Sequence, residues 1–285
     1  MIPDSVDLKR KQKLSSALEK ALAVLEFMVR RPLGCPVSEI ATALNMPVSG
    51  VHRLLKELER SGYVRQAHSM GEYTLTIKLA SLGLSFLGQT GFCDLSQPIL
   101  DDLAQTSQEL VRLALADGDH LIWIGVAQGA TSGLRYDPGS EQGQIAHLAS
   151  SAGGQAWLAA MSDEEAIALV MQQGLHKTQP AGEAAPQSIA ELLSILATTR
   201  ERGYSMNSNS FLAGMAAMAT VIYQADTQQA IGTVSIAGPS ARLTPAVMQG
   251  MATALKQAAL ALGEASRASL YFSQHRPKPA LRKLA

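Results

Sequence analysis

The sequence has few cysteines, few aromatic residues, no net charge and no long apolar run, and these shortages exclude several classes of protein. Cys35 and Cys93 lie far apart, which fits neither a disulfide-rich domain nor a paired-cysteine metal or redox motif. No stretch reaches the ~18 unbroken apolar residues of a membrane helix. The opening residues MIPDSVDLKRKQK lack the apolar segment of a secretory signal. We therefore expect a cytoplasmic protein with no membrane partner, no metal and no cofactor.

Length and charge distribution suggest two domains with different partners. The 285 residues suit two domains, and the 47% hydrophobic content is enough for a sizeable core in each. The 24 basic and 24 acidic residues balance overall, but they are unevenly spread. Up to Lys78 there are 12 Lys and Arg against 8 Asp and Glu, whereas from Leu79 onward there are 12 against 16. The basic N-terminal end favours a polyanionic partner for that end alone.

The N-terminal third predicts three helices. Apolar residues recur at helical spacing over 16–30, where Ser16 is a candidate N-cap. A short second helix is expected from Ser38, ending at Asn45 in a left-handed turn. The third helix should run from Pro47 to about Ser61, since proline suits the start of a helix.

The third helix and the residues after it predict a winged helix-turn-helix. Val51 and Leu55 belong to an apolar stripe, opposite a polar face. Segments 63–65 and 73–75 read as a strand pair with a polar tip between them. Two helices, a tight turn and a hairpin suit major-groove binding, so the partner should be double-stranded DNA. A three-helix domain with a merely solvated basic face is the alternative, which this order of elements disfavours. The candidate DNA contacts are Ser49, His52, Arg53, Lys56, Arg60 and Arg65.

The remaining two thirds predict an α+β domain with an antiparallel sheet and helices. Helices are expected at 77–90, 95–107 and 151–161, after the capping signals at Ser162 and Ser188, and from 245 toward 271; strands are expected at 110–116, 121–126, 216–223 and 229–237, with a short one at 134–136. This mixed order with hairpin turns favours antiparallel pairing. The basic, proline-bearing tail 273–285 is expected to be flexible.

One segment of this domain is a candidate for ligand binding. Residues 150–155, SSAGGQ, lead into a helix whose free N–H groups are suited to a carboxylate. Close packing of the helix on the sheet explains the same small residues equally well. Arg135 is the best basic candidate for pairing such a carboxylate, although a solvated surface position is the commoner role of an arginine.

The chain resembles the IclR-type transcriptional regulators from about Leu14 to Phe272. The resemblance is carried by LSSALEKALAVLEFM, VSEIATALNMPVSGVHRLLKELERSGYV, GEYTL, SSAGGQAWLA, RERGYSM, FLAGMAAMATVI and TVSIAGPSARLT. It implies a winged helix-turn-helix at 14–76, a linker helix at 77–92 and a GAF-like effector domain at 93–272. It also implies a homodimer or dimer of dimers on a palindromic operator, acting as repressor or activator, often on a catabolic operon.

The resemblance also implies an effector pocket, with a small organic acid as the expected ligand. Its candidate residues are Ser150, Ser151, Ala152, Gly153, Gly154, Asn207, Asn209, Ala217 and Ser235. Relatives often carry acidic residues near Asn207 and a cysteine at Ala217, so this pocket wall is expected to be polar but uncharged. In the third helix, Val48 and Gly50 replace residues that are often basic and small or hydroxylated in the family.

Two other classes of function stay open at this point. An enzyme is disfavoured because the sequence has no nucleophile elbow, zinc-protease motif or P-loop, and His147 and His176 are lone histidines. A metal- or redox-sensing regulator would need Cys35 and Cys93 to act together, yet one falls in each presumed domain.

Overall fold

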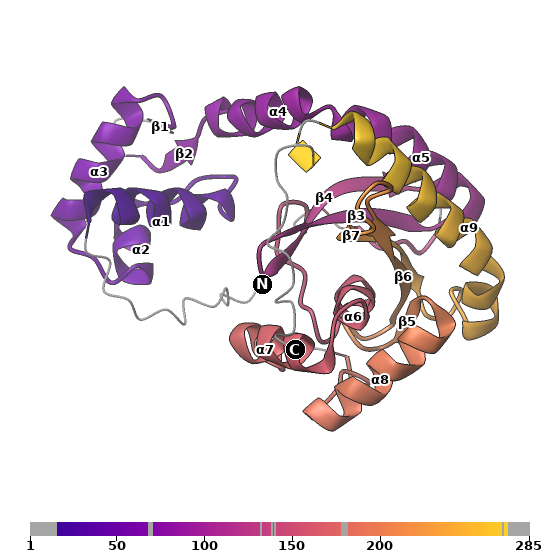
Figure 1. The fold of residues 1–285 in the computed structure, drawn as a ribbon. Helices are drawn as coiled ribbons and strands as arrows, with labels where there is room; N and C mark the ends of the chain where they lie inside the picture. Colours follow the sequence, from indigo (N-terminus) through magenta and orange to yellow (C-terminus); the bar gives the residue numbers. More distant parts are fainter. Residues whose placement is uncertain are drawn as a thin grey trace, which may run out of the picture. The chain divides into compact units, whose positions relative to one another are not determined.

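The computed structural model describes residues 16–67, 71–131, 133–137, 139, 141–177, 182–269 and 271–272. The chain forms two compact units that divide between Leu87 and Gly88, within the linker helix (Figure 1). The expected tail at 273–285 lies outside the described residues. Among the described residues, every helix is too short or too polar to span a lipid bilayer.

The N-terminal unit is a helical core with a small hairpin. Its elements are α1 (Ala17–Val29), α2 (Val37–Ala43), α3 (Val48–Arg60), β1 (Val64–Gln66) and β2 (Tyr73–Leu75), followed by α4 (Lys78–Thr90). The strands pair antiparallel, with Val64 opposite Leu75. Val24, Ile40 and Leu55 are fully buried where the three helices and the hairpin meet. The expected helix-helix-turn-helix-hairpin order is therefore present.

The ends of these helices follow local signals with one exception. The Ser16 hydroxyl accepts a hydrogen bond from the Glu19 N–H, and the Glu19 carboxylate accepts one from the Ser16 N–H. Asn45 adopts the expected left-handed conformation at φ 50°, and Gly62 ends α3 at φ 77°. The prediction that Ser38 caps the second helix is wrong, because α2 already begins at Val37 and its N-cap is Pro36, without a side-chain hydrogen bond.

The C-terminal unit is built on one five-stranded antiparallel sheet. Its strands are β3 (Leu110–Asp117), β4 (His120–Gln128), β5 (Ser205–Ser208), β6 (Met215–Tyr223) and β7 (Ala230–Pro239). The spatial order is β4-β3-β7-β6-β5. Arg112 lies opposite Ser235, and Asn207 lies opposite Ala217. Because opposite residues share a face, these pairings determine which side chains reach the same side of the sheet.

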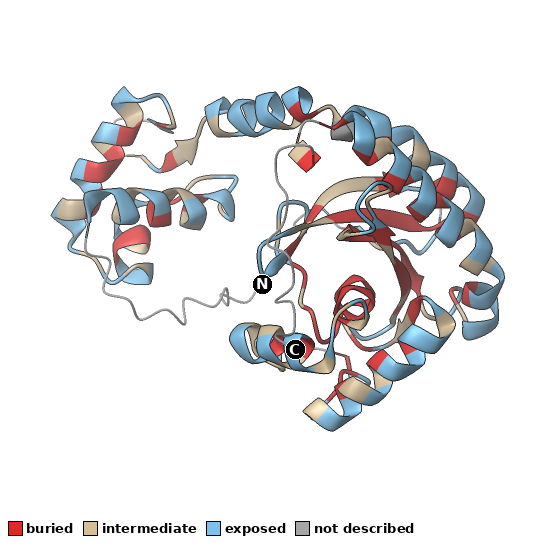
Figure 2. Cartoon of the chain, in the orientation of Figure 1, coloured by how far each residue is buried: buried red, intermediate tan, exposed pale blue. Residues whose placement is uncertain are grey.

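Helices cover both faces of this sheet. Helices α5 (Phe92–Ser107) and α9 (Pro245–Ala265) pack on one face, and α6 (Ala152–Ala159) packs on the other. Helices α7 (Asp163–Gln173) and α8 (Ile189–Arg202) flank α6, and a 3-10 turn, Ser266–Ala268, follows α9. Figure 2 shows α6 buried along its length, whereas the outer helices expose one side. The short, small-residue helix is thus enclosed between the sheet and α8.

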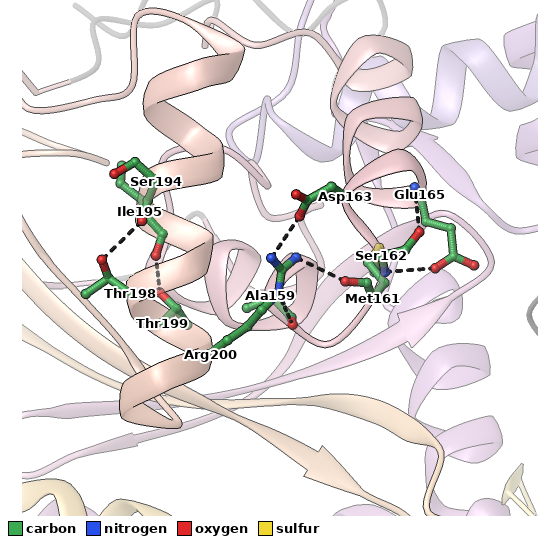
Figure 3. Close-up of polar contacts among 10 residues, drawn as sticks. All are labelled: Ala159, Met161, Ser162, Asp163, Glu165, Ser194, Ile195, Thr198, Thr199 and Arg200. Atoms are coloured by element: carbon green, nitrogen blue, oxygen red, sulfur yellow. Dashed lines mark hydrogen bonds and ion pairs between the residues drawn. The ribbon is translucent and has the colours of Figure 1, made fainter.

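Arg200 of α8 ties the helices around α6 together (Figure 3). Its guanidinium donates to the carbonyls of Ala159 (3.0 Å) and Met161 (3.1 Å), which lie at the end of α6. It also pairs with Asp163 in the first turn of α7 at 2.8 Å. One side chain therefore satisfies two carbonyls left without helical partners and forms an ion pair with the next helix.

Three expectations for this unit need correction. Residues 134–136 form no strand in the structure, and the four residues of β5 form one that was not expected. The Ser188 hydroxyl does accept from the Glu191 N–H, as a capping signal requires. A full capping box would also need the Glu191 carboxylate to accept from the Ser188 N–H, but it accepts from the Gln187 N–H instead. The four residues of β5, Ser205–Ser208, are too few and too polar to show the alternation of apolar and polar residues by which a strand is recognised in a sequence.

Candidate nucleic-acid interface and effector pocket

Helix α3 presents most of its expected DNA contacts to solvent. Ser49, His52, Arg53 and Arg60 are exposed, while the opposite face of the helix is buried in the core. No other atom lies within 4 Å of where a Gly50 β-carbon would be, so this turn of the helix is open on its outer side. The helix therefore offers one long polar face with two arginines.

Lys56 differs from the other candidates because it is engaged within its own domain. Its ammonium donates to the Glu59 carboxylate (2.9 Å) and lies 5.7 Å from the centre of the Tyr73 ring. It also lies 3.5 Å from the Gln66 side-chain oxygen. The hydrogen bond to Glu59 raises the pKa of Lys56. These contacts link α3 to the hairpin, which indicates that Lys56 positions the two elements against each other.

The hairpin carries the last expected DNA contact. Arg65 of β1 is exposed, and its Nε donates to the Thr74 hydroxyl at 3.4 Å. The tip between the strands includes residues 68–70, which lie outside the described residues. Arg65 thus adds an exposed guanidinium on the hairpin to the two that α3 presents.

The C-terminal unit has a pocket between the sheet, the start of α6 and the segment before Glu141. It is lined by Arg112, Tyr136, Ser151, Ala152, Asn207, Phe211, Met215, Ala216, Ala217 and Ala237. Its volume is about 20 Å³, enough for one or two water molecules. Four of the expected effector contacts line it, namely Ser151, Ala152, Asn207 and Ala217. An effector larger than this space requires the surrounding side chains to move.

The other expected effector contacts lie around the pocket rather than in its lining. Ser150 has its carbonyl bonded by Asn207 (3.3 Å) and Ser210 (2.9 Å). Asn209 is an exposed turn residue at φ 55°, and its side-chain oxygen accepts from the Gly214 N–H at 2.7 Å. Ser235 is buried on β7 beside Arg112.

The two glycines at the start of α6 are explained by close packing. A β-carbon on Gly154 would lie 2.4 Å from the Cα of Leu148, and one on Gly153 would lie 3.0 Å from the Thr233 hydroxyl. Neither glycine lines the pocket. Of the two explanations for these small residues, packing accounts for Gly153 and Gly154, while Ser151 and Ala152 reach the pocket.

The N-terminus of α6 is braced by polar side chains. The Ser151 hydroxyl accepts from the Gly154 N–H at 3.0 Å. The side-chain amide of Asn207 donates to the Gln155 side-chain oxygen at 2.9 Å, and the Gln155 amide donates to the Ala149 carbonyl at 2.9 Å. Gln155 is fully buried, so this chain of amides fixes the helix start relative to β5.

The charged side chain in the pocket lining is that of Arg112. Arg112 has a side chain only 8% exposed and pairs with Glu141. Its guanidinium carbon lies 4.5 Å from the centre of the Trp123 ring. Arg135, the basic residue expected there, is exposed and outside the lining. A lone arginine inside the apolar run Leu110–Ala116 was the signal in the sequence, since a charged residue at such a position needs a buried partner.

A metal or redox site finds little support in the described part of the chain. There, His, Cys, Asp and Glu side chains nowhere gather in the groups of three that a metal ion needs. Cys35 is buried, and burial raises the pKa of its thiol to about 11, with the Glu39 carboxylate adding to the effect. A thiol of this kind carries little thiolate near pH 7 and reacts slowly.

Both halves of the chain match known family models. Residues 17–68 match the IclR helix-turn-helix domain, and residues 85–264 match the C-terminal domain of the bacterial transcriptional regulator IclR. The HTH-type transcriptional repressor AllR of Escherichia coli (strain K12) is 28% identical over 233 residues, covering 82% of this chain and 83% of the relative. AllR of Salmonella typhi has the same identity and coverage.

Solved structures of similar fold cover most of the chain. The IclR of Thermotoga maritima aligns with a TM-score of 0.67 and 26% identity, covering 88% of this chain and 97% of that one. An IclR homolog from Microbacterium hydrocarbonoxydans, complexed with 4-hydroxybenzoate, aligns with a TM-score of 0.72 and 20% identity, covering 89% and 100%. The latter likeness establishes the fold alone.

The winged helix-turn-helix with its exposed basic face, joined to an antiparallel-sheet domain, defines a DNA-binding transcriptional regulator with an effector-binding domain. The chain belongs to the IclR family of bacterial transcriptional regulators. The family and the relatives that match are regulators rather than enzymes, which decides between these two classes.

Proposed function

We propose that this regulator binds a palindromic operator as a homodimer or dimer of dimers in the cytoplasm, and that a small organic acid changes its operator affinity. The observation that carries the ligand class is the buried guanidinium of Arg112 in the pocket lining, close to the start of α6. A guanidinium and a helix N-terminus both favour an anion. An effector-bound relative, the Microbacterium protein with 4-hydroxybenzoate, is in line with an organic acid.

The operator is proposed to contact α3, with Ser49, His52 and Arg53 reaching base edges. Arg60 and the exposed Arg65 of the hairpin supply contacts to phosphates. One such helix reads only a few base pairs, so two copies about one helical turn apart are needed for a long site. Leu82 and Phe86 of α4, four residues apart on one helix face, are 50% and 55% exposed, which favours this helix as a contact between copies.

The test is footprinting on the DNA upstream of the neighbouring genes, with and without the organic acids that those genes' enzymes would consume. We expect protection of two half-sites related by a two-fold axis, and an altered protection curve with one of the acids. Light scattering at micromolar concentration should show a dimer or larger assembly. A monomer that protects a single half-site contradicts the assembly, and protection unchanged by every acid contradicts the sensing role.

A further inference from the structure

The environment of Arg112 determines which acids the pocket accepts, and this inference rests on the proposed function. Arg112 pairs with Glu141 through one terminal nitrogen, Nη1. Its Nε is also buried and has no hydrogen-bond partner among the described residues. The planar guanidinium can bind a carboxylate through two parallel N–H groups, so a single bond to Glu141 leaves donor capacity for a second anion.

Tyr136 holds Glu141 from the other side. The Tyr136 hydroxyl donates to the second carboxylate oxygen of Glu141. Burial raises the pKa of Tyr136, and Glu141 raises it further, so the phenol stays protonated as a donor. Tyr136 and Arg112 both line the pocket, and the Glu141 side chain is 16% exposed. The Glu141 carboxylate is therefore held in place by two residues of the pocket lining, Arg112 and Tyr136.

A second cation lies close to this pair. The Lys177 ammonium is 3.5 Å from the centre of the Phe211 ring, which also lines the pocket. Burial lowers the pKa of Lys177, and the charge of Arg112 lowers it too, whereas Glu141 raises it. This partly buried group thus contains two cations and one carboxylate. Asp137, the other acidic residue near Tyr136, is exposed, so water screens its charge.

This charge balance distinguishes acids of different charge. One further carboxylate would give two anions to two cations. A dianion would leave an excess negative charge beside Glu141, among the rings of Trp123 and Phe211, where an uncompensated charge is costly. We propose that Arg112 binds the carboxylate of a monoanionic effector and that Glu141, on the same guanidinium, excludes dicarboxylates.

The experiment compares ligands of equal shape and different charge. Calorimetry on the full chain would use terephthalate against 4-carbamoylbenzoate, and succinate against succinamate, because each amide replaces one carboxylate of its partner. We expect wild type to bind at least one monoanionic amide and to bind it more tightly than the matching dianion. Failure of all four probes to bind at millimolar concentration would overturn the proposal.

Substitutions then assign the selectivity to residues. Glu141→Gln keeps the size of the side chain and removes its charge, so dianion affinity should rise to at least that of the amide. Arg112→Met should weaken monoanion binding roughly 10- to 100-fold, because a charge-assisted hydrogen bond is lost. Arg112→Lys should restore part of that loss, and Arg135→Met, at the exposed arginine, should change nothing. An unchanged mono-to-dianion ratio in Glu141→Gln would overturn the role of Glu141.

The same variants separate this assignment from the wider function. Operator affinity is measured for each protein with and without the bound probe. If a probe changes the operator affinity of wild type and of Arg112→Met by the same factor, the regulator senses acids but not through Arg112. If a probe binds through Arg112 and operator affinity stays constant, the binding site is correct and the sensing role is wrong. Circular dichroism confirms that each variant is folded.

Discussion

Gly154 packs directly against the backbone of Leu148: a β-carbon at Gly154 would lie 2.4 Å from both the Cα and the carbonyl oxygen of Leu148. These are backbone atoms, which cannot rotate away as a side chain does. The contact joins the start of α6 to the loop that precedes it, so it fixes where the helix lies over the sheet.

Gly154→Ala is therefore expected to destabilise the C-terminal unit by about 1–3 kcal/mol or more, as overpacking does. The matched control is Gly250→Ala in α9, where no other atom lies within 4 Å of the added carbon. This control should stabilise the protein by about 0.5–1 kcal/mol through helix propensity. Both tryptophans, Trp123 and Trp157, lie in the C-terminal unit, so their fluorescence in urea reports its unfolding. Equal stability of the two variants would contradict the packing account.

Arg53 and Lys56 are expected to differ in their effect on DNA binding, although both are basic residues of α3. Arg53→Ala should cost roughly 1–3 kcal/mol in operator affinity and relax sequence preference, since an exposed guanidinium can pair with a guanine. Lys56→Met should leave the salt dependence of binding nearly unchanged and lower the thermal stability, because Lys56 bonds Glu59 instead of extending outward. Anisotropy titrations at several salt concentrations measure the operator affinity and its salt dependence for both variants, and thermal unfolding measures their stability. A salt slope reduced by ~0.9 in Lys56→Met would identify a phosphate contact and contradict this assignment.

His147 should make the C-terminal unit sensitive to acid. Burial lowers its pKa from 6.5 to about 4, and the charges of Lys177 and His176 lower it too, while the Gly174 carbonyl raises it. The folded state thus holds the neutral imidazole, whose Nδ1 lies 2.8 Å from the Ser150 hydroxyl. Its contribution is complete above pH 6.5 and is lost as the pH falls toward 4, by up to about 3 kcal/mol.

Urea titrations monitored by fluorescence at pH 7.5 and pH 4.5 test this dependence. His147→Gln should lose less stability between the two pH values than wild type does. His52→Gln, at an exposed histidine of the other unit, is the control and should behave as wild type. An acid response that is the same in all three proteins would show that His147 does not carry it.

Arg200 should stabilise the C-terminal unit through its three contacts. Arg200→Met keeps the aliphatic stem but leaves the Ala159 and Met161 carbonyls without this donor and removes the ion pair with Asp163. We expect a loss of about 1–3 kcal/mol in urea unfolding. Glu201→Gln, at the next and exposed position of α8, should change stability by less than about 0.5 kcal/mol. Similar values for the two substitutions would mean that the contacts contribute little.

The N-terminal unit could be predicted closely because its signals are local. Ser16, Asn45 and Gly62 each determine a helix end within a few residues of themselves, and the stripe of apolar residues in α3 marks its buried face. Ser38 was a plausible cap, but Pro36 precedes it as the N-cap, and the helix begins at Val37.

The effector pocket was predicted less well because its contacts join distant parts of the chain. Arg112 meets Glu141, and Asn207 meets Ser150 and Gln155, only when β3, β5 and α6 come together. These pairings cannot be inferred from the spacing of residues along the sequence. The family resemblance pointed to Ser151, Ala152, Asn207 and Ala217, which line the pocket. The sequence alone favoured the exposed Arg135 as the basic residue in place of Arg112.

We propose that a small carboxylate, bound in the pocket of Arg112, controls how this IclR-family protein binds DNA. The most direct measurement is the anisotropy of a labelled upstream DNA fragment titrated with the full chain, with and without a saturating monocarboxylate. The half-saturation concentration should shift by roughly 5- to 150-fold, the usual range of coupling between two sites. Superimposable curves in the presence of every bound monocarboxylate would contradict it.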